Sequence, residues 1–180
     1  MSLALRVLFV SGGDANGFLR VSEFTVSSAN GAVGRGLHLA DIAFTKAESQ
    51  GQTTEQVVVT IRYSKTDQRG QSSSVVLPEN KVKDMCPVYM LKQYLTLRTP
   101  GAGQLFWHFN KSPVTRYQFS TIVKKSLLSQ HISSEGITSH SFRIGACTHF
   151  ALAGVSDDEL KKMGRWKSDA YQRYIRIPST

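Results

Sequence analysis

Short apolar runs rich in β-branched residues mark the middle of this chain, and longer amphipathic runs fill its second half. The segments LHLADIAF (37–44), EQVVVTIRYSKT (55–66) and SSSVVLP (72–78) have the composition of strands. The polar stretch DQRGQ separates the last two segments and has the composition of a turn. We therefore expect a three-stranded antiparallel sheet with a hairpin tip near residues 67–71.

Helical spacing of apolar residues predicts the other elements. A helix is expected directly after Pro87, because proline is well tolerated in a first turn. Ser156 with Glu159 has the S-x-x-E form of a capping box, and Ser168 is a candidate N-cap for the last helix. These elements indicate a single α+β domain over residues 1–180, mostly α. The predicted helical segments are 3–10, 18–27, 88–99, 115–130, 139–153, 157–163 and 169–176.

Length and composition exclude several classes of protein. With 180 residues, 41% of them hydrophobic and 19% charged, the chain suits one compact domain rather than a disordered segment. No apolar run reaches the roughly 20 residues of a membrane helix, and Arg6 interrupts the apolar start of the chain, so we expect an intracellular protein with no membrane partner. Cys86 and Cys147 lie far apart, which excludes a disulfide framework and a zinc ribbon.

Positive charge is concentrated in the middle of the chain. The sequence has 22 Lys and Arg against 13 Asp and Glu, a net charge of +9. Residues 56–125 hold 11 basic and 3 acidic side chains, a local excess of +8. Scattered lysines and arginines often form an ordinary solvated surface, but so few acids in one block favour a face that follows a nucleic-acid backbone.

The residues best suited to chemistry lie in SHSFRIGA and GRWKSDAYQRYIR, near the C-terminus. On a helix, His140 and Arg143 are three residues apart and share a face, so they would present an imidazole beside a guanidinium to an oxyanion. Trp166 follows the glycine at which the preceding helix is expected to end, and Tyr171 and Tyr174 share a face of the next helix. The other histidines have no carboxylate or cysteine partners at ligand spacing, so we expect no metal site.

With these motifs the chain resembles the catalytic domain of the tyrosine recombinase, or phage integrase, family. FLRVSEF matches the first box of the family, with Arg20 as its arginine, and SKTD matches the segment that carries the family's lysine, Lys65. HSFR supplies the H-x-x-R element as His140 and Arg143. The three boxes occur in the family's order, and the resemblance covers roughly residues 4–176. It implies the family's mostly helical catalytic fold.

The segment GRWKSDAYQRYIR completes the resemblance. Trp166 falls where the family has His or Trp, and Tyr174 falls at the nucleophile. These two residues are eight positions apart, one fewer than the usual spacing, so Tyr171 stays an alternative nucleophile. Ile175 and Arg176 match the family beside Tyr174 and favour it. The segment is most similar to recombinases of eukaryotic mobile elements of the DIRS and Crypton kinds, which would imply a nuclear location.

The resemblance implies DNA strand breakage and rejoining by site-specific recombination, in the integration or excision of a mobile element. The tyrosine oxygen would attack a phosphodiester and form a 3′-phosphotyrosyl intermediate, with no metal or other cofactor. Arg20 and Arg143 would bind the phosphate, because a guanidinium stays charged and holds oxyanions in a planar fork. His140 would hold another phosphate oxygen or move the tyrosine proton, and Trp166 would donate its indole N–H. Lys65 would protonate the leaving oxygen.

The implied partner is double-stranded DNA, with self-association to a tetramer on it. Only 19 residues precede Arg20, so we expect the family's N-terminal core-binding domain to be absent from this chain. Glu23 is expected to orient Arg20 or to cap its helix rather than to react. Two alternatives stay open: a non-catalytic DNA-binding module derived from such an enzyme, and a type IB topoisomerase-like activity.

Overall fold

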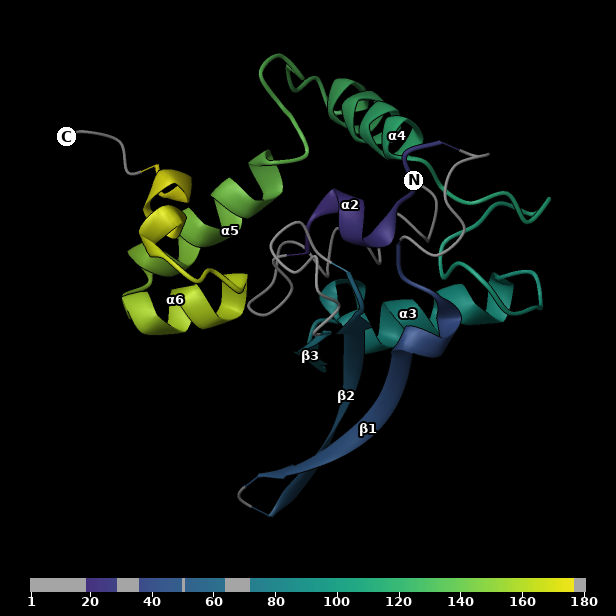
Figure 1. Cartoon of the computed structure of the whole chain (residues 1–180), viewed down its shortest axis with the longest axis horizontal. Helices are drawn as coiled ribbons and strands as arrows, with labels where there is room; N and C mark the ends of the chain where they lie inside the picture. Colours follow the sequence, from purple (N-terminus) through teal and green to yellow (C-terminus); the bar gives the residue numbers. More distant parts are fainter. Residues whose placement is uncertain (1–18, 29–35, 50, 64–71, 177–180) are drawn as a thin grey trace.

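A computed structural model of the chain places each predicted element that lies within the residues it describes (Figure 1). The helix expected at 3–10 and the hairpin tip expected at 67–71 lie outside these residues, and so does Lys65. The structure describes residues 19–28, 36–49, 51–63 and 72–176.

The predicted three-stranded antiparallel sheet is confirmed among the described residues. Its strands are β1 (Ile42–Ser49), β2 (Gln52–Ile61) and β3 (Ser73–Pro78), in the order β1-β2-β3. Alternate residues of a strand point to the same face, so the buried valines of β2 and β3 turn one face of the sheet toward the core. β1 and β2 also extend beyond β3 as a two-stranded ribbon that projects from the body of the molecule (Figure 1).

The first strand begins later than the sequence predicts. A 3₁₀ turn, η1 (Leu39–Asp41), occupies the start of the expected strand. The buried Asp41 carboxylate stabilises this turn, because it accepts a hydrogen bond from the backbone N–H of His38 (2.8 Å) and pairs with the Arg62 guanidinium. The strand then continues through a polar segment whose composition does not predict a strand. It is extended there because its backbone pairs with β2 up to the Ser49–Gln52 register.

The helical predictions hold, with differences at the ends and in the first helix. Thr25 ends α2 early, in an extended conformation with its Oγ1 donating to the Val21 carbonyl (2.5 Å), so the expected helix at 18–27 is four residues long. The predicted caps are confirmed: Ser156 Oγ accepts from Glu159 N–H, and Ser168 Oγ accepts from Ala170 N–H. The helices are α2 (Val21–Phe24), η2 (Lys83–Met85), α3 (Pro87–Leu97), α4 (Arg116–Ser129), α5 (Ser141–Leu152), α6 (Asp157–Gly164) and η3 (Asp169–Tyr174).

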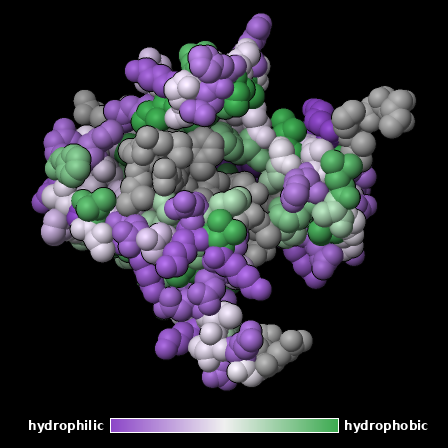
Figure 2. All heavy atoms as spheres, turned by 180° about the vertical axis from the view of Figure 1, so that it is seen from behind, coloured by the Kyte–Doolittle hydropathy of each residue, from purple (hydrophilic) through white to green (hydrophobic). Residues whose placement is uncertain are grey.

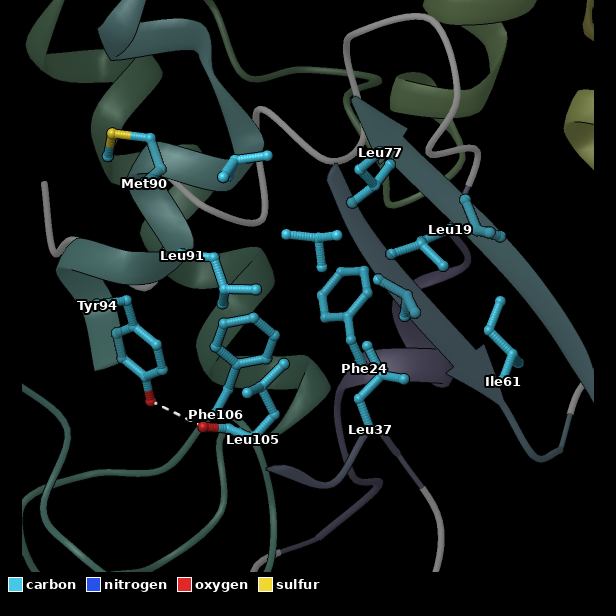
Figure 3. Close-up of a cluster of buried hydrophobic side chains, with 14 of the residues drawn as sticks. Leu19, Phe24, Leu37, Ile61, Leu77, Met90, Leu91, Tyr94, Leu105 and Phe106 are labelled. Atoms are coloured by element: carbon cyan, nitrogen blue, oxygen red, sulfur yellow. Dashed lines mark hydrogen bonds between the residues drawn. The ribbon is translucent and has the colours of Figure 1, made fainter. Parts of the chain in front are cut away.

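The larger group of buried apolar residues, here called the main core, lies between the sheet, α2, α3 and α4 (Figure 3). The Phe24 ring packs edge-on against Phe119 of α4, with 5.3 Å between ring centroids. Tyr94 of α3 donates from its Oη to the Leu105 carbonyl (3.0 Å), the hydrogen bond drawn in Figure 3. This core fixes α2, and with it Arg20, on the body of the molecule.

A smaller group of buried residues, here called the C-terminal cluster, joins α5, α6 and η3. Its buried members are Ala146, Cys147, Leu160 and Tyr171. In Figure 1 these three elements lie together on one side, and α2 lies between them and α3. The candidate site is built where α2 of the main core meets the C-terminal cluster.

One face of the molecule carries many polar residues (Figure 2). Figure 2 shows hydrophilic residues over much of the face seen from behind, including the projecting sheet ribbon. In the part of the chain that the structure describes, no helix is both long enough and apolar enough to cross a membrane.

Candidate active site

A buried carboxylate at the start of α2 holds two arginines. Glu23 is the third residue of this helix, so its side chain reaches back to the N-cap residue and accepts hydrogen bonds from Arg20 N–H (2.8 Å) and Arg20 Nη1 (2.9 Å). The second guanidinium comes from the end of α6, where Arg165 Nη2 donates to Glu23 Oε2 (2.6 Å). The Glu23 side chain is 1% exposed. The prediction that Glu23 orients Arg20 and caps its helix is confirmed.

A third guanidinium lies deeper in the site. Arg143 on α5 is 2% exposed, and its Nη2 donates to the carbonyl oxygen of Gly164 (3.0 Å). Burial, together with the neighbouring charge of Arg20, lowers the pKa of Arg143 to about 10. Arg143 is therefore still a cation at neutral pH, held where little water screens its charge.

The turn after α6 brings Trp166 over this arginine. A Cβ atom on Gly164 would lie 1.7 Å from Cζ3 of Trp166, so a residue with a side chain has no room beneath the ring. The guanidinium carbon of Arg143 lies 4.6 Å from the centroid of the Trp166 ring, a cation–π contact. Trp166 thus forms one wall around Arg143.

Arg165, between Gly164 and Trp166, is the C-cap of α6. Its backbone is in the left-handed region (φ 54°, ψ 40°), where glycine and asparagine are the usual residues. The side chain is 15% exposed, and burial lowers the pKa of its guanidinium. The chain therefore keeps an arginine at a position where the backbone favours glycine.

Tyr174, at the end of η3, lies beside Arg143. Its ring centroid is 5.6 Å from the Arg143 guanidinium carbon and 5.2 Å from the centroid of the Trp166 ring. The His140 ring, at the N-terminal end of α5, lies 6.2 Å away between centroids. The phenol of Tyr174 is half-buried, between a guanidinium, an indole and an imidazole.

Tyr171 has a different environment. Its side chain is 1% exposed and is part of the C-terminal cluster. A hydrogen bond to the Asp157 carboxylate raises the pKa of its phenol, because the carboxylate favours the protonated form. Tyr171 therefore packs the cluster, whereas Tyr174 lies beside the Arg143 guanidinium.

One threonine of α5 fixes the segment that carries Tyr174. Thr148 Oγ1 donates to the Tyr174 carbonyl (3.2 Å) and accepts from Arg176 N–H (2.9 Å). Both bonds join α5 to the backbone at the end of η3. The position of the Tyr174 phenol relative to Arg143 therefore depends on a few specific polar contacts.

The site carries more positive than negative charge. Three guanidinium groups and one carboxylate give a local charge of +2, from Arg20, Arg143 and Arg165 (+3) and Glu23 (−1). Such a cluster suits an oxyanion with one or two negative charges. Among the described residues, no group of three or more His, Cys, Asp or Glu is placed to hold a metal ion.

Comparison with protein families decides what kind of domain this is. Residues 45–178, more than half of the 180-residue chain, match the model of the phage integrase family. The chain belongs to the phage integrase family. His140, Arg143, Trp166 and Tyr174 lie inside the matched residues, and Arg20 lies before them. No curated protein matches the chain.

Solved structures of the Tn1549 transposon integrase have a similar fold. The structure of that integrase with circular intermediate DNA gives a TM-score of 0.58 at 16% identity, and the match covers 98% of this chain and 53% of that one. Its variant with transposon right end DNA gives a TM-score of 0.52 at 19% identity, covering 98% and 54%. This phage integrase family chain thus spans about half the length of those proteins and has the tyrosine-recombinase catalytic fold.

The fold of this phage integrase domain brings five of the six predicted site residues into one neighbourhood, and the sixth, Lys65, lies outside the described residues. Arg20 is the N-cap residue of α2, next to the main core, and the other four come from α5 and its N-cap, from η3 and from the turn after α6. The five residues are Arg20, His140, Arg143, Trp166 and Tyr174.

Sequence reasoning missed Arg165 in this phage integrase domain. One signal was present: Trp166 is one position closer to Tyr174 than the family's usual spacing, and Arg165 is the residue one position earlier. The glycine at which the helix is expected to end indicated Gly164 and Trp166 instead. Thr148 carried no signal, because a threonine within a helix is common and its two partners are 26 and 28 residues away.

Proposed function

We propose that this chain breaks and rejoins DNA strands in site-specific recombination, with Tyr174 as the nucleophile. The observation that carries the proposal is the half-buried phenol of Tyr174, 5.6 Å from the Arg143 guanidinium carbon, at a site with a local charge of +2. The similar solved proteins are a transposon integrase bound to DNA, which agrees with DNA as the partner.

The charge of the site suits the reaction. A phosphodiester carries one negative charge, and the transition state of attack gathers a second on the non-bridging oxygens. Cations fixed beforehand around those oxygens stabilise the transition state more than the ground state. Arg20 and Arg143 are held by Glu23 and the Gly164 carbonyl, so they need little rearrangement when the charge develops.

In the first step, the Tyr174 oxygen forms a bond to phosphorus and the bond to the 5′ oxygen breaks. The products are a 3′-phosphotyrosyl ester and a 5′-hydroxyl. A phenol has an ordinary pKa near 10, so its proton must leave during attack. His140, whose ring lies 6.2 Å from the Tyr174 ring, is placed to accept that proton or to hold a phosphate oxygen.

The leaving 5′ oxygen needs a proton, and we propose Lys65 as its source. This assignment rests on the SKTD motif, since Lys65 lies outside the described residues. In the second step a 5′-hydroxyl loses its proton to Lys65 and attacks the phosphotyrosyl ester, and the Tyr174 oxygen leaves and regains a proton. The ester conserves the energy of the broken bond, so joining requires no nucleotide or other cofactor.

The environments of the two tyrosines support Tyr174 over Tyr171. A nucleophile must be reached by a DNA strand and must lose its proton readily. Tyr171 is 1% exposed and has a raised pKa from its bond to Asp157, whereas Tyr174 is half-exposed beside cations.

We extend the proposal to a biological setting. The GRWKSDAYQRYIR segment supports a mobile element of the DIRS or Crypton kind, in which case integration or excision takes place in the nucleus. We also propose that the chain acts on double-stranded DNA as a tetramer. Light scattering of the chain with and without duplex DNA tests that assembly, and a monomer at saturating DNA contradicts it.

The test of the reaction uses nicked duplexes, in which the short strand beyond the cleaved bond diffuses away and traps the covalent complex. The chain is incubated with a pool of labelled nicked duplexes of randomised sequence and separated on a denaturing gel. We expect a protein–DNA adduct with the wild-type chain and with Tyr171→Phe, and none with Tyr174→Phe. Peptide mapping of the adduct should find the nucleotide on Tyr174.

Each other result favours a different assignment. Loss of the adduct only with Tyr171→Phe moves the nucleophile to Tyr171. Salt-sensitive DNA binding without any adduct favours a non-catalytic binding module. Relaxation of a supercoiled plasmid without joining of strands between two duplexes favours a type IB topoisomerase-like activity.

A further inference from the structure

We propose that Arg165 is a further catalytic residue, whose guanidinium binds a non-bridging oxygen of the phosphate that Tyr174 attacks. This inference rests on the proposed function and adds a residue to its site. It starts from the hydrogen bonds that Arg165 makes and from the N–H groups that it leaves without an acceptor.

The guanidinium of Arg165 uses only part of its donor capacity. Its Nη2 donates to Glu23 Oε2 (2.6 Å), whereas its buried Nε and Nη1 have no hydrogen-bond partner among the described residues. A guanidinium has five N–H donors in a fixed plane, and leaving buried donors without acceptors is unfavourable. An oxyanion is the ligand that would satisfy them, because it supplies both acceptors and compensating charge.

Glu23 holds Arg165 beside the other cations of the site. One carboxylate oxygen pairs with Arg20 and the other with Arg165, so two guanidinium groups lie on the two sides of one buried anion. The charge of Arg165 also acts on Arg143, whose pKa it helps to lower. A ligand bound between these cations would meet Arg165 together with Arg20 and Arg143.

The backbone gives a second, independent observation. Arg165 is in the left-handed conformation, one of three non-glycine residues with positive φ among the described residues. Side chains are disfavoured there, and a glycine would end the helix with less strain. An arginine at this position is explained if its side chain, which turns toward Glu23 on α2, has a task at the site.

The competing explanation is that Arg165 serves only as an ion-pair partner that ties α6 to α2. The two explanations differ in what they predict for the substrate. A structural ion pair lowers the rate by the same factor whatever the chemistry of the phosphate. A direct contact raises the rate only when the phosphate carries the charged oxygen that Arg165 binds.

The experiment therefore combines Arg165 variants with altered phosphates. Single-turnover adduct formation is measured at saturating DNA on the nicked duplex that reacts best with the wild-type chain. The same duplex is also made with a methylphosphonate, in each of its two diastereomers, at the cleaved position. One neutral methyl group then replaces one non-bridging oxygen. The variants are Arg165→Met and Arg165→Lys, and the latter keeps a cation that can pair with Glu23.

Lys162→Met is the matched control. Lys162 is an exposed lysine of the same helix, three residues before Arg165, and its substitution also removes one positive charge. We expect this control to react at the wild-type rate on every substrate at saturating DNA.

On the normal phosphate we expect Arg165→Met to slow adduct formation by about 10²-fold or more, and Arg165→Lys by about tenfold. On one methylphosphonate diastereomer, the ratio of the wild-type rate to the Arg165→Met rate should fall to less than about tenfold. The proposal is overturned if this ratio of rates is the same on all three substrates, or if both Arg165 variants react at the wild-type rate.

Failure of the proposed function gives a different result. If the wild-type chain forms no adduct, or if Tyr174→Phe still forms it, the function itself is wrong. Thermal unfolding of each variant shows whether it is folded at the assay temperature. If Arg165→Met is not folded, Arg165→Lys decides by the same comparison across the three substrates.

Discussion

The main core and the C-terminal cluster hold their side chains in place by different means. The main core is a continuous apolar body, with buried aliphatic and aromatic residues from the sheet and three helices. The C-terminal cluster has four buried members, and polar groups enter it directly: Arg143 bonds to the Gly164 carbonyl, and Thr148 bonds to the backbone of η3. Apolar burial dominates in the first region, whereas the second combines a smaller apolar cluster with individual polar contacts.

This difference between the main core and the C-terminal cluster explains why the site lies where the two regions meet. Arg20 and Glu23 are fixed because α2 is packed into the main core, and they provide a rigid edge. The nucleophile candidate Tyr174 is on the C-terminal cluster, whose geometry a single contact can change. The Glu23–Arg165 ion pair joins the two regions. Changes in the main core should therefore alter stability, and changes in the C-terminal cluster should alter reactivity.

The largest expected effect is on stability, and it tests the claim that changes in the main core alter stability rather than reactivity. Leu91 on α3 is 3% exposed within the main core (Figure 3). Leu91→Ala leaves a cavity and should lower the free energy of unfolding by about 2–5 kcal/mol. Urea denaturation measures this loss. At a temperature where the variant is folded, its rate of adduct formation should equal that of the wild type, and a slower rate would mean that the two regions are not separable.

A smaller effect is expected at Gly164, in the C-terminal region. Gly164→Ala places a methyl group where the Trp166 ring lies, so the ring must move. Overpacking of this kind costs about 1–3 kcal/mol in the free energy of unfolding. Because Trp166 covers Arg143, adduct formation should fall by more than the stability loss explains. Near-ultraviolet circular dichroism should report the displaced indole.

Gly145 provides the matched control for this substitution. It lies in α5, and a Cβ atom there would meet nothing within 4 Å. Gly145→Ala should raise stability by about 0.5–1 kcal/mol, because alanine is the better helix former, and should leave adduct formation unchanged. If the two alanine variants behave alike, the close approach of Trp166 to Gly164 is not what matters.

The next effect concerns the bonds that fix η3. Thr148→Val keeps the shape of the side chain and removes both the bond to the Tyr174 carbonyl and the bond from Arg176 N–H. Each hydrogen bond contributes about 1 kcal/mol to stability, so we expect the free energy of unfolding to fall by about 1–2 kcal/mol. Adduct formation should be roughly five- to tenfold slower, because the backbone that carries Tyr174 is held less firmly. Thr148→Ser keeps the hydroxyl and should restore the rate. A slow Thr148→Ser variant would point to packing instead of hydrogen bonding.

The smallest expected effect is none at all. The cations of the proposed reaction are the guanidinium groups of Arg20, Arg143 and Arg165, which the chain supplies itself. Adduct formation should therefore proceed at the same rate in EDTA as in magnesium. A rate that falls in EDTA and returns with a divalent ion would show that the arginines alone do not carry the charge compensation.

Much of the fold was predictable because its information is local. The β-branched runs gave the sheet, and the helical spacing gave α3 to α6 close to their observed ends. The polar part of β1 was not predictable, because its partner strand holds it through backbone hydrogen bonds that any sequence can make. The 3₁₀ turn before it depends on Arg62, 21 residues away from Asp41, for one of its contacts.

For the site, the motifs predicted residue types but not their partners. His140 and Arg143 were expected on one face, yet His140 is exposed at the start of α5 and Arg143 is buried. The choice between Tyr171 and Tyr174 was open in the sequence, since both fit helical spacing. Their different environments follow from how η3 packs on α5 and α6.

By itself, the sequence determined most of the elements, the two predicted helix caps and membership of the phage integrase family, since each of these depends on residues a few positions apart or on motifs in a fixed order. Only the tertiary structure decided that Glu23 binds Arg165, 142 residues further along the chain, and that Trp166 covers Arg143. Such contacts depend on how the main core and the C-terminal cluster pack against each other, and no local spacing encodes that packing.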